Sequence, residues 1–190
     1  MSRLQINHPL PGGTVFSNFL VAQGEGDPAI RNIIGIIWDP SGMVVAVGMA
    51  LQNPPHWAIT FTDFKPGSGY CLEVIDANTR QRLACAGPFD AVLKAPAHGP
   101  SVYFPTLNGS LDRNGWAYGY TPGINAVEGS VTGPAGASPW VFQSQGPPAT
   151  RYWAVPFSGL TPDPTHMSTL TVREKVNPAS ATSVTGLAIT

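Results

Sequence analysis

The chain has 190 residues, enough for one large domain or for two of about 95. Hydrophobic residues make up 43% of it, so a core can form, whereas charged residues make up only 11% and the formal net charge is −1. A chain so poor in charge lacks the basic surface that binding to nucleic acid or to anionic lipid requires. We therefore expect neither nucleic acid nor a membrane as its partner.

No targeting or membrane-spanning segment is visible in the sequence. The first seven residues are too short and too polar for a signal peptide. The longest apolar run, residues 33–38, is far shorter than the roughly 20 residues that span a bilayer. These observations do not determine in which cellular compartment the protein acts.

Short β-branched or aromatic runs alternate with turn signals along the chain, and helical periodicity is absent. In the first half the predicted strands cover residues 14–16, 33–38, 43–49, 57–61, 70–75 and 82–86. We interpret the 21 glycines and 20 prolines as residues of turns and strand edges. Short strands at a spacing of about ten residues predict an all-β sandwich or barrel.

The second half repeats the first in an ordered series of matches. Gly35 recurs as Gly129 at an offset of 94, and Trp57 recurs as Trp153 at an offset of 96. Insertions in loops produce such a drift in offset, and we interpret the series as a duplication. The boundary falls in a stiff Pro/Gly/Ala segment. The predicted domains are therefore residues 1–94 and 101–190, joined by a linker at 95–100.

The start of the first half, Pro9-Leu10-Pro11-Gly12-Gly13-Thr14-Val15, resembles the opening of many bacterial immunoglobulin-like modules. A strand ending at Gly24, an aromatic strand that begins at Trp57 and a closing hairpin continue the resemblance over nearly the whole chain. The second half departs at its start, where the double glycine is missing. The resemblance implies two tandem immunoglobulin-like (fibronectin-III-like) β-sandwich domains with a binding or spacing role. It carries over no catalytic residue.

Two cysteines, Cys71 and Cys85, flank the predicted closing hairpin. A register in which paired residue numbers sum to 156 places them opposite each other and allows a bridge. A register that sums to 157 pairs Leu72 with Cys85 and Val74 with Leu83 on one apolar face. Burial of that face favours the second register. Both cysteines are therefore predicted to be free thiols, with Cys85 buried.

No group of residues has the spacing of a catalytic or metal site. Hydrolase and phosphate-binding motifs are missing, and each histidine stands alone beside turn residues. Glu25, Asp27 and Asp163 are the best calcium candidates, but they are too few for a dedicated site and are interpreted as turn-forming acids. We therefore predict no enzyme activity, no metal and no cofactor.

The candidate binding residues are Trp116, Tyr118 and Tyr120, which alternate with Ala117 and Gly119 on one predicted strand. The matching strand of the first half keeps the small residues and carries Gln and Glu between them, so the small face should point inward in both halves. The three rings then face outward as a stripe for a partner or a sugar. The alternative is that the second half reversed this strand and buried the rings.

These features favour a non-catalytic structural, adhesive or decoration module that acts by protein–protein binding or self-assembly. Low charge, Gly/Pro-rich loops and duplication suit a cell-surface or virion component. The alternative is a carbohydrate-binding module that stacks sugar rings on the aromatic stripe.

Overall fold

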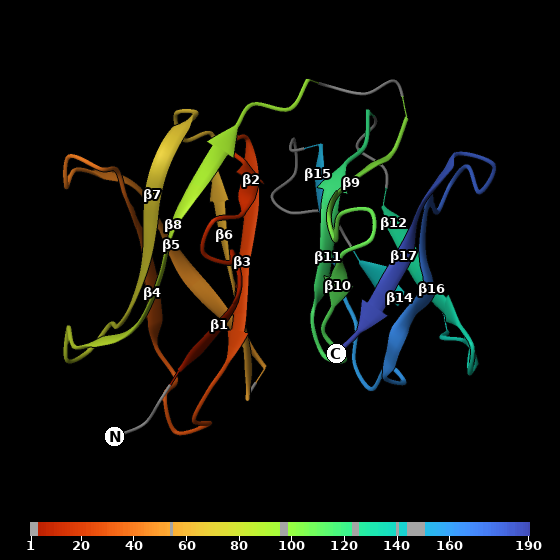
Figure 1. Cartoon of the computed structure of the whole chain (residues 1–190), viewed down its shortest axis with the longest axis horizontal. Helices are drawn as coiled ribbons and strands as arrows, with labels where there is room; N and C mark the ends of the chain where they lie inside the picture. Colours follow the sequence, from red (N-terminus) through yellow and green to blue (C-terminus); the bar gives the residue numbers. More distant parts are fainter. Residues whose placement is uncertain (1–3, 54, 96–98, 123–125, 140, 144–150) are drawn as a thin grey trace. The chain divides into compact units, whose positions relative to one another are not determined.

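The computed structural model describes the chain except for residues 1–3, 54, 96–98, 123–125, 140 and 144–150. All regular structure among the described residues is β-strand, which confirms the all-β prediction. These residues contain no helix that could cross a membrane. The chain divides into two compact units, Met1–Lys94 (unit 1) and Ala95–Thr190 (unit 2). Figure 1 shows their strands.

Unit 1 is built from two sheets that share one long strand. Its strands are β1 (Gln5–His8), β2 (Thr14–Phe16), β3 (Phe19–Glu25), β4 (Ile33–Trp38), β5 (Val44–Asn53), β6 (His56–Thr62), β7 (Gly67–Asp76) and β8 (Arg82–Val92). The order is β1-β3-β6-β5-β4-β7-β8-β2, in which β5 pairs first with β4 and, from Ala50, with β6. Among the described strands of unit 1, β2 and β8 are the one pair that runs parallel. This is the strand pairing of the immunoglobulin fold. Strands A, B and E of one sheet correspond to β1, β3 and β6, and strands C, F and G of the other correspond to β4, β7 and β8.

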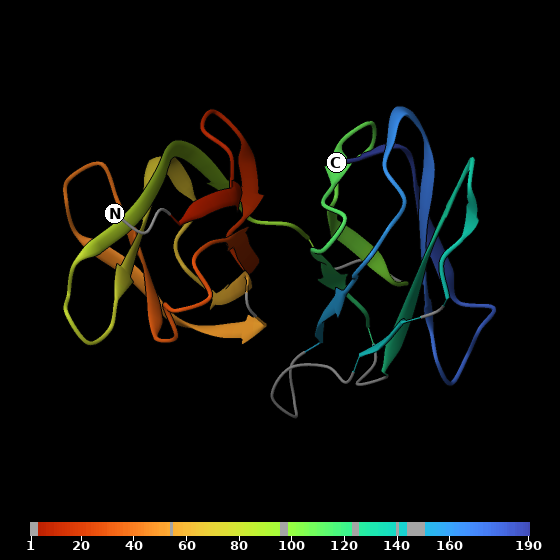
Figure 2. The same ribbon diagram turned by 90° about the horizontal axis from the view of Figure 1, so that it is seen from below.

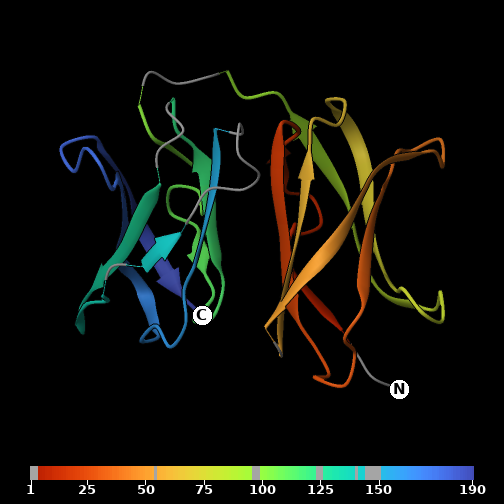
Figure 3. The ribbon, with the colours of Figure 1, turned by 180° about the vertical axis from the view of Figure 1, so that it is seen from behind.

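Unit 2 has the same pairing in two separate sheets. Its strands are β9 (Ser101–Phe104), β10 (Ser110–Leu111), β11 (Trp116–Tyr120), β12 (Val127–Gly133), β13 (Gly136–Ala137), β14 (Val141–Gln143), β15 (Tyr152–Pro156), β16 (Asp163–Glu174) and β17 (Ala181–Ile189). One sheet has the order β15-β11-β9 and the other β10-β17-β16-β12-β13, with β14 also on β12. Within each unit the two sheets lie face to face (Figure 2 and Figure 3).

Each core lies between the two sheets because alternate strand residues point inward. On β4 the inner residues Ile33 and Ile37 are buried, whereas Ile34, Ile36 and Trp38 between them are half-buried. The largest buried side chains of the two cores are Phe61, Phe89, Leu20, Ile37, Ile59 and Leu72 in unit 1, and Trp153, Leu111, Leu170 and Leu187 in unit 2.

A glycine faces a buried tryptophan at the same place in both units. A Cβ added to Gly24 would lie 2.5 Å from the Trp57 ring, and one added to Gly119 would lie 2.6 Å from the Trp153 ring. Each added Cβ would also overlap a backbone carbonyl of the neighbouring first strand, β1 or β9. The small face of this strand therefore points inward in both units, as predicted.

The favoured register of the closing hairpin, in which paired numbers sum to 157, holds beside the turn, where Ile75 pairs with Arg82, but a bulge between Val74 and Ile75 shifts it by one residue further along. Leu72 pairs with Ala86 and Glu73 with Cys85, so paired numbers sum to 158 at the centre of β7 and β8. The physical reason is this bulge, because a shift of one residue turns the side chains of β8 to the other side of the sheet. Cys85 is consequently exposed rather than buried, and Cys71 is partly exposed. Neither cysteine forms a disulfide in the structure.

Candidate binding surfaces

The outer side of the β5-β4-β7-β8 sheet of unit 1 carries a contiguous apolar surface, here called the apolar face. Register places its side chains next to one another, since Ile34 lies opposite Met49 and Ile36 opposite Val47. The apolar face consists of Ile34, Ile36 and Trp38 on β4, Val44, Val47 and Met49 on β5, Cys71 and Ile75 on β7, and Cys85 on β8.

Several side chains of the apolar face are open to solvent. Val47 is 61% exposed and Met49 is 74% exposed, and Val44 beside them is exposed as well. A single exposed apolar residue is normal on a protein surface, whereas a contiguous patch marks an interaction site. The exposure is greatest on β5, at the edge of the sheet.

The carboxylate of Glu73, at the centre of the apolar face, already has a hydrogen-bond donor and a cation as partners. The indole N–H of Trp38 donates to Glu73 Oε2 at 2.9 Å, and Arg82 Nε lies 2.5 Å from Glu73 Oε1. The Glu73 side chain is only 14% exposed. This surface therefore offers a partner apolar contact area rather than a free charge.

The outer positions of three strands in unit 2 are polar. They are Glu128, Ser130 and Thr132 on β12, Thr169, Thr171 and Arg173 on β16, and Ser183 on β17. Arg173 Nε lies 2.5 Å from Glu128 Oε1, and the hydroxyls of Thr171 and Ser183 are 3.0 Å apart. The strand pairing of unit 2 is thus compatible with polar residues on the outer side of β12, β16 and β17.

The two faces can be compared position by position because their registers coincide. Ile37 pairs with Leu72 in unit 1, and Val131 pairs with Leu170 in unit 2. Counting outward from these inner pairs, the residues of unit 1 and their counterparts in unit 2 are Ile34 and Glu128, Ile36 and Ser130, Trp38 and Thr132, Cys71 and Thr169, Ile75 and Arg173, and Cys85 and Ser183. The fold itself does not require the apolar residues.

The strands that flank β4 and β12 do not show this contrast. In unit 1, β5 pairs with β4 over Val44–Met49. In unit 2, β13 and β14 pair with β12 instead, with Ala137 opposite Thr132 and Phe142 opposite Glu128. The polar character of unit 2 is therefore a property of β12, β16 and β17.

The three aromatic residues singled out from the sequence lie together on β11. Trp116 is half-buried, but Tyr118 is only 1% exposed and Tyr120 is buried as well. The rings lie on the side of β11 opposite the inward-facing Gly119. The structure therefore combines the two alternatives, since the strand is not reversed and yet two of the three rings are buried.

Ring contacts with the flanking strands order these aromatics. Tyr118 stacks on Phe104 with 5.9 Å between ring centroids, and Tyr120 packs edge-on against Tyr152 at the same distance. Arg151 Nη1 donates to the Tyr120 hydroxyl at 3.3 Å. A sugar stacks on a free ring face, which Trp116 offers only in part. Sugar binding at these residues stays a prediction.

A tyrosine ring fills the corner before β7 in unit 1. The Tyr70 hydroxyl donates to the Lys65 carbonyl at 2.7 Å, and the ring packs edge-on against Phe64 with centroids 5.9 Å apart. Phe89 lies on its other side at 6.2 Å. A hydroxyl at the start of strand F that bonds to upstream backbone is the tyrosine corner of immunoglobulin-like domains.

Unit 2 has a carboxylate network in place of that ring. Ser168 takes the position of Tyr70, because it pairs with Leu187 as Tyr70 pairs with Phe89. The Ser168 hydroxyl donates to Asp163 Oδ2 at 2.6 Å, and the backbone N–H of Thr165 donates to Oδ1 at 3.0 Å. Hydrogen bonds from the Ser168 and Thr165 hydroxyls lower the pKa of Asp163 to about 2.

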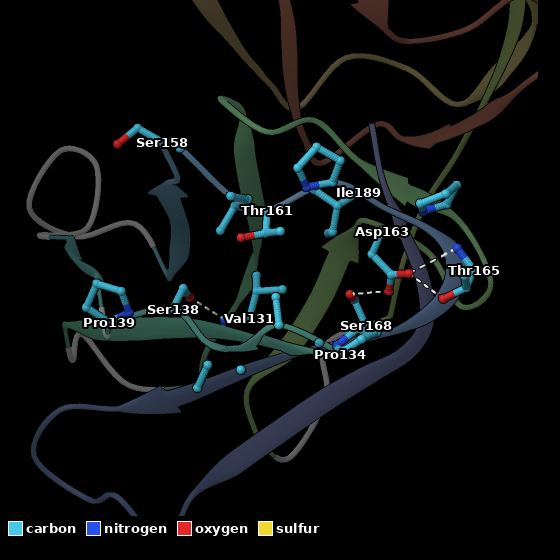
Figure 4. A pocket seen from close by; sticks show the side chains of 18 residues that line it. Val131, Pro134, Ser138, Pro139, Ser158, Thr161, Asp163, Thr165, Ser168 and Ile189 are labelled. Atoms are coloured by element: carbon cyan, nitrogen blue, oxygen red, sulfur yellow. Dashed lines mark hydrogen bonds between the residues drawn. The ribbon is translucent and has the colours of Figure 1, made fainter.

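The smaller residues leave a surface pocket of about 480 Å³ beside this corner (Figure 4). Val131, Leu160 and Ile189 line it together with a Pro/Gly/Ser-rich rim. Asp163 also lines the pocket, but its oxygens already accept bonds from within its own loop. We interpret Asp163 as a loop cap and assign no ligand to the pocket.

The other calcium candidates also belong to turns. Asp27 Oδ1 accepts from the backbone N–H of Ala29 at 2.9 Å, which is a turn-forming bond. Among the residues that the structure describes, no three His, Cys, Asp or Glu side chains are grouped to hold a metal ion.

No protein-family model matches the chain, and no curated protein matches it. Among solved structures, the BSP domain of a biofilm associated protein is similar over 99% of this chain and 29% of its own, with a TM-score of 0.42 and 12% identity. A Salmonella alpha-2-macroglobulin mutant matches over 99% of this chain and 14% of its own (TM-score 0.35, 10% identity). The titin domains Z1Z2, solved with telethonin, match over 98% and 94% (TM-score 0.26, 13% identity).

The chain thus spans less than a third of the first two of these structures. The assignment of an immunoglobulin-like β-sandwich rests on the strand pairing within the chain itself.

Proposed function

We propose that the chain is a non-catalytic adhesive or structural module of two tandem immunoglobulin-like domains, which binds protein through the apolar face of unit 1. One observation carries the proposal: the outer positions of β4 and β7 are largely apolar where the same positions of β12 and β16 in unit 2 are polar, and the exposed Val44, Val47 and Met49 of β5 continue this apolar surface. Residues that the fold does not need, and that cost solubility, are best explained by a partner that covers them. A cell surface or a particle surface is the setting in which such a module would act.

The energetic gain from such binding comes from covering exposed side chains. Full burial of a Val or Met side chain contributes about 1.5–3 kcal/mol, and Val47 and Met49 have most of their surface still available. Glu73 does not need a cation from the partner, because Arg82 already neutralises its charge. A partner with an extended apolar strand or sheet face fits this surface.

Site-specific photo-crosslinking in the cells that produce the chain tests the proposal. A photoreactive benzoyl-phenylalanine replaces Val47 on the apolar face, and in the matched control it replaces the exposed Ser183 on the polar face of unit 2. Protein adducts are expected from position 47 and not from position 183, and Ile36→Ser should reduce them. Equal yields from both positions, or none from position 47, would contradict the proposal.

A further inference from the structure

We infer that the apolar face is a redox-responsive binding surface, from which oxidation of Met49 to its sulfoxide releases the partner. This inference rests on the proposed function and adds its regulation. The chain has 2 cysteines and 4 methionines, and three of these residues, Met49, Cys71 and Cys85, belong to the apolar face. The positions of the two cysteines hold Thr169 and Ser183 in unit 2, which carry no sulfur. Groups that peroxide oxidises are therefore concentrated on the surface that is proposed to bind.

Met49 is open to an oxidant in solution. It is 74% exposed, and it lies on the outer side of β5 opposite Ile34. In the reaction, the O–O bond of hydrogen peroxide breaks, one oxygen forms a bond with the thioether sulfur and the other leaves as water. The sulfur loses two electrons and the peroxide gains them, so the step needs no further reactant. Methionine sulfoxide is polar, and sulfoxide reductases reverse its formation.

The added oxygen makes the apolar face unfavourable to cover. The side chains of Ile34 and Val47 beside Met49 contain no hydrogen-bond donor, so the sulfoxide oxygen bonds to water as long as the face is free. An apolar partner removes that water without replacing its hydrogen bond, which is costly. We expect binding to weaken by about tenfold or more. The change goes in the direction of unit 2, whose outer positions on β12 and β16 are polar.

Met167 in unit 2 provides a matched control. It is 70% exposed, close to the 74% of Met49, but it lies on β16 outside the apolar face. The same oxidant should therefore convert both residues, whereas the sulfoxide of Met49 alone changes the surface that is proposed to bind. If exposure to the oxidant were all that mattered, the two residues would have equal effects on binding.

Photo-crosslinking of the full chain, with benzoyl-phenylalanine in place of Val47, tests this inference. Every chain carries Cys71→Ala, Cys85→Ala and Met43→Leu, so that the thioether of Met49 is the sulfur group that remains on the apolar face. The purified chain is oxidised with hydrogen peroxide, separated from it, and irradiated in a lysate of the cells that produce the protein. Oxidation of Met49, followed by mass spectrometry of its peptide, should lower the yield of protein adducts by about tenfold.

Met49→Leu should keep the yield after peroxide treatment, because leucine takes up no oxygen, and Met167→Leu should lose it like the parent chain. Circular dichroism should show that the oxidised chain is folded, as expected for a side chain so exposed. Three results would overturn the inference and leave the proposed function standing: adducts undiminished by the sulfoxide at Met49, a loss that Met49→Leu does not prevent, or unfolding of the oxidised chain. A chain that yields no adducts before treatment would remove both proposals.

Discussion

Units 1 and 2 share their strand pairing and differ in what they present to solvent. Inside, both have a glycine against a buried tryptophan and apolar inner residues on the C and F strands. Outside, Ile34 and Ile36 of unit 1 stand where unit 2 has Glu128 and Ser130. The inner residues are thus enough for this fold, and the outer residues were free to diverge. Unit 2 thus serves as an internal comparison, and the proposed binding role of the apolar face of unit 1 rests on this difference.

The two units also differ in the side chains that hold the corner before the F strand. Unit 1 holds it with the Tyr70 ring and hydroxyl, whereas unit 2 holds it with the Asp163 carboxylate. Two different chemistries satisfy one backbone geometry. The pocket of unit 2 follows from this exchange of a large ring for small polar side chains.

The largest effects should come from the glycines that both units share. Gly24→Ala should destabilise unit 1 and Gly119→Ala unit 2, each by about 3 kcal/mol or more, because the new methyl overlaps a tryptophan ring and a carbonyl. Hydrogen exchange followed by mass spectrometry assigns the loss to one unit.

The matched control is Gly99→Ala, since a Cβ at Gly99 meets no atom within 4 Å. It should leave exchange in both units unchanged. If Gly24→Ala were as mild as this control, the shared packing of glycine on tryptophan would not be a determinant of the fold.

The corner substitutions should have intermediate effects. Ser168→Ala removes a donor to a carboxylate and should cost about 2 kcal/mol in unit 2. Tyr70→Phe removes one neutral hydrogen bond and should cost about 1 kcal/mol in unit 1, because the ring still fills its place. Amide exchange of the two corners measures both values. A larger loss for Tyr70→Phe than for Ser168→Ala would contradict the assignment of the carboxylate as the main cap.

Acid should loosen the corner of unit 2 through Asp163. Its pKa is about 2 in the folded chain, below the ordinary 3.8, so the unfolded chain takes up the proton first as the pH falls. The stability that Asp163 contributes is present above pH 4 and is lost between about pH 4 and pH 2. Asp163→Asn should remove this part of the pH dependence, measured by amide exchange at Thr165 and Ser168. An unchanged pH profile in the variant would show that Asp163 does not act as the cap.

The sequence predicted the β class, most strand positions of unit 1 and the inward direction of Gly24 and Gly119, because side-chain alternation and turn residues are local signals. The hairpin register was predicted only beside the turn, because the bulge between Val74 and Ile75 that shifts it further along has no local signal in the sequence. Nor could the burial of Tyr118 be predicted, since its ring contacts lie on other strands, as the stack on Phe104 shows.

The apolar face was missed although a signal for it was present. The β4 sequence IIGIIW is apolar on both sides, whereas its repeat in β12, VEGSVTG, alternates between apolar and polar residues. A strand that is apolar on both sides is typical of burial on both sides. Comparison of the two repeats, position by position, would have shown that unit 1 has one apolar side in excess.

The most direct test of the central claim transfers the polar face of unit 2 onto unit 1. The double variant Ile34→Glu, Ile36→Ser introduces the residues found at Glu128 and Ser130 and leaves the buried Ile75 in place. The free energy of opening the unit 1 core, measured by hydrogen exchange on monomeric protein, should change by no more than about 1 kcal/mol. The inward control Ile37→Ser should lose about 2–5 kcal/mol. A loss in the double variant as large as in this control would show that the apolar face serves the fold and not a partner.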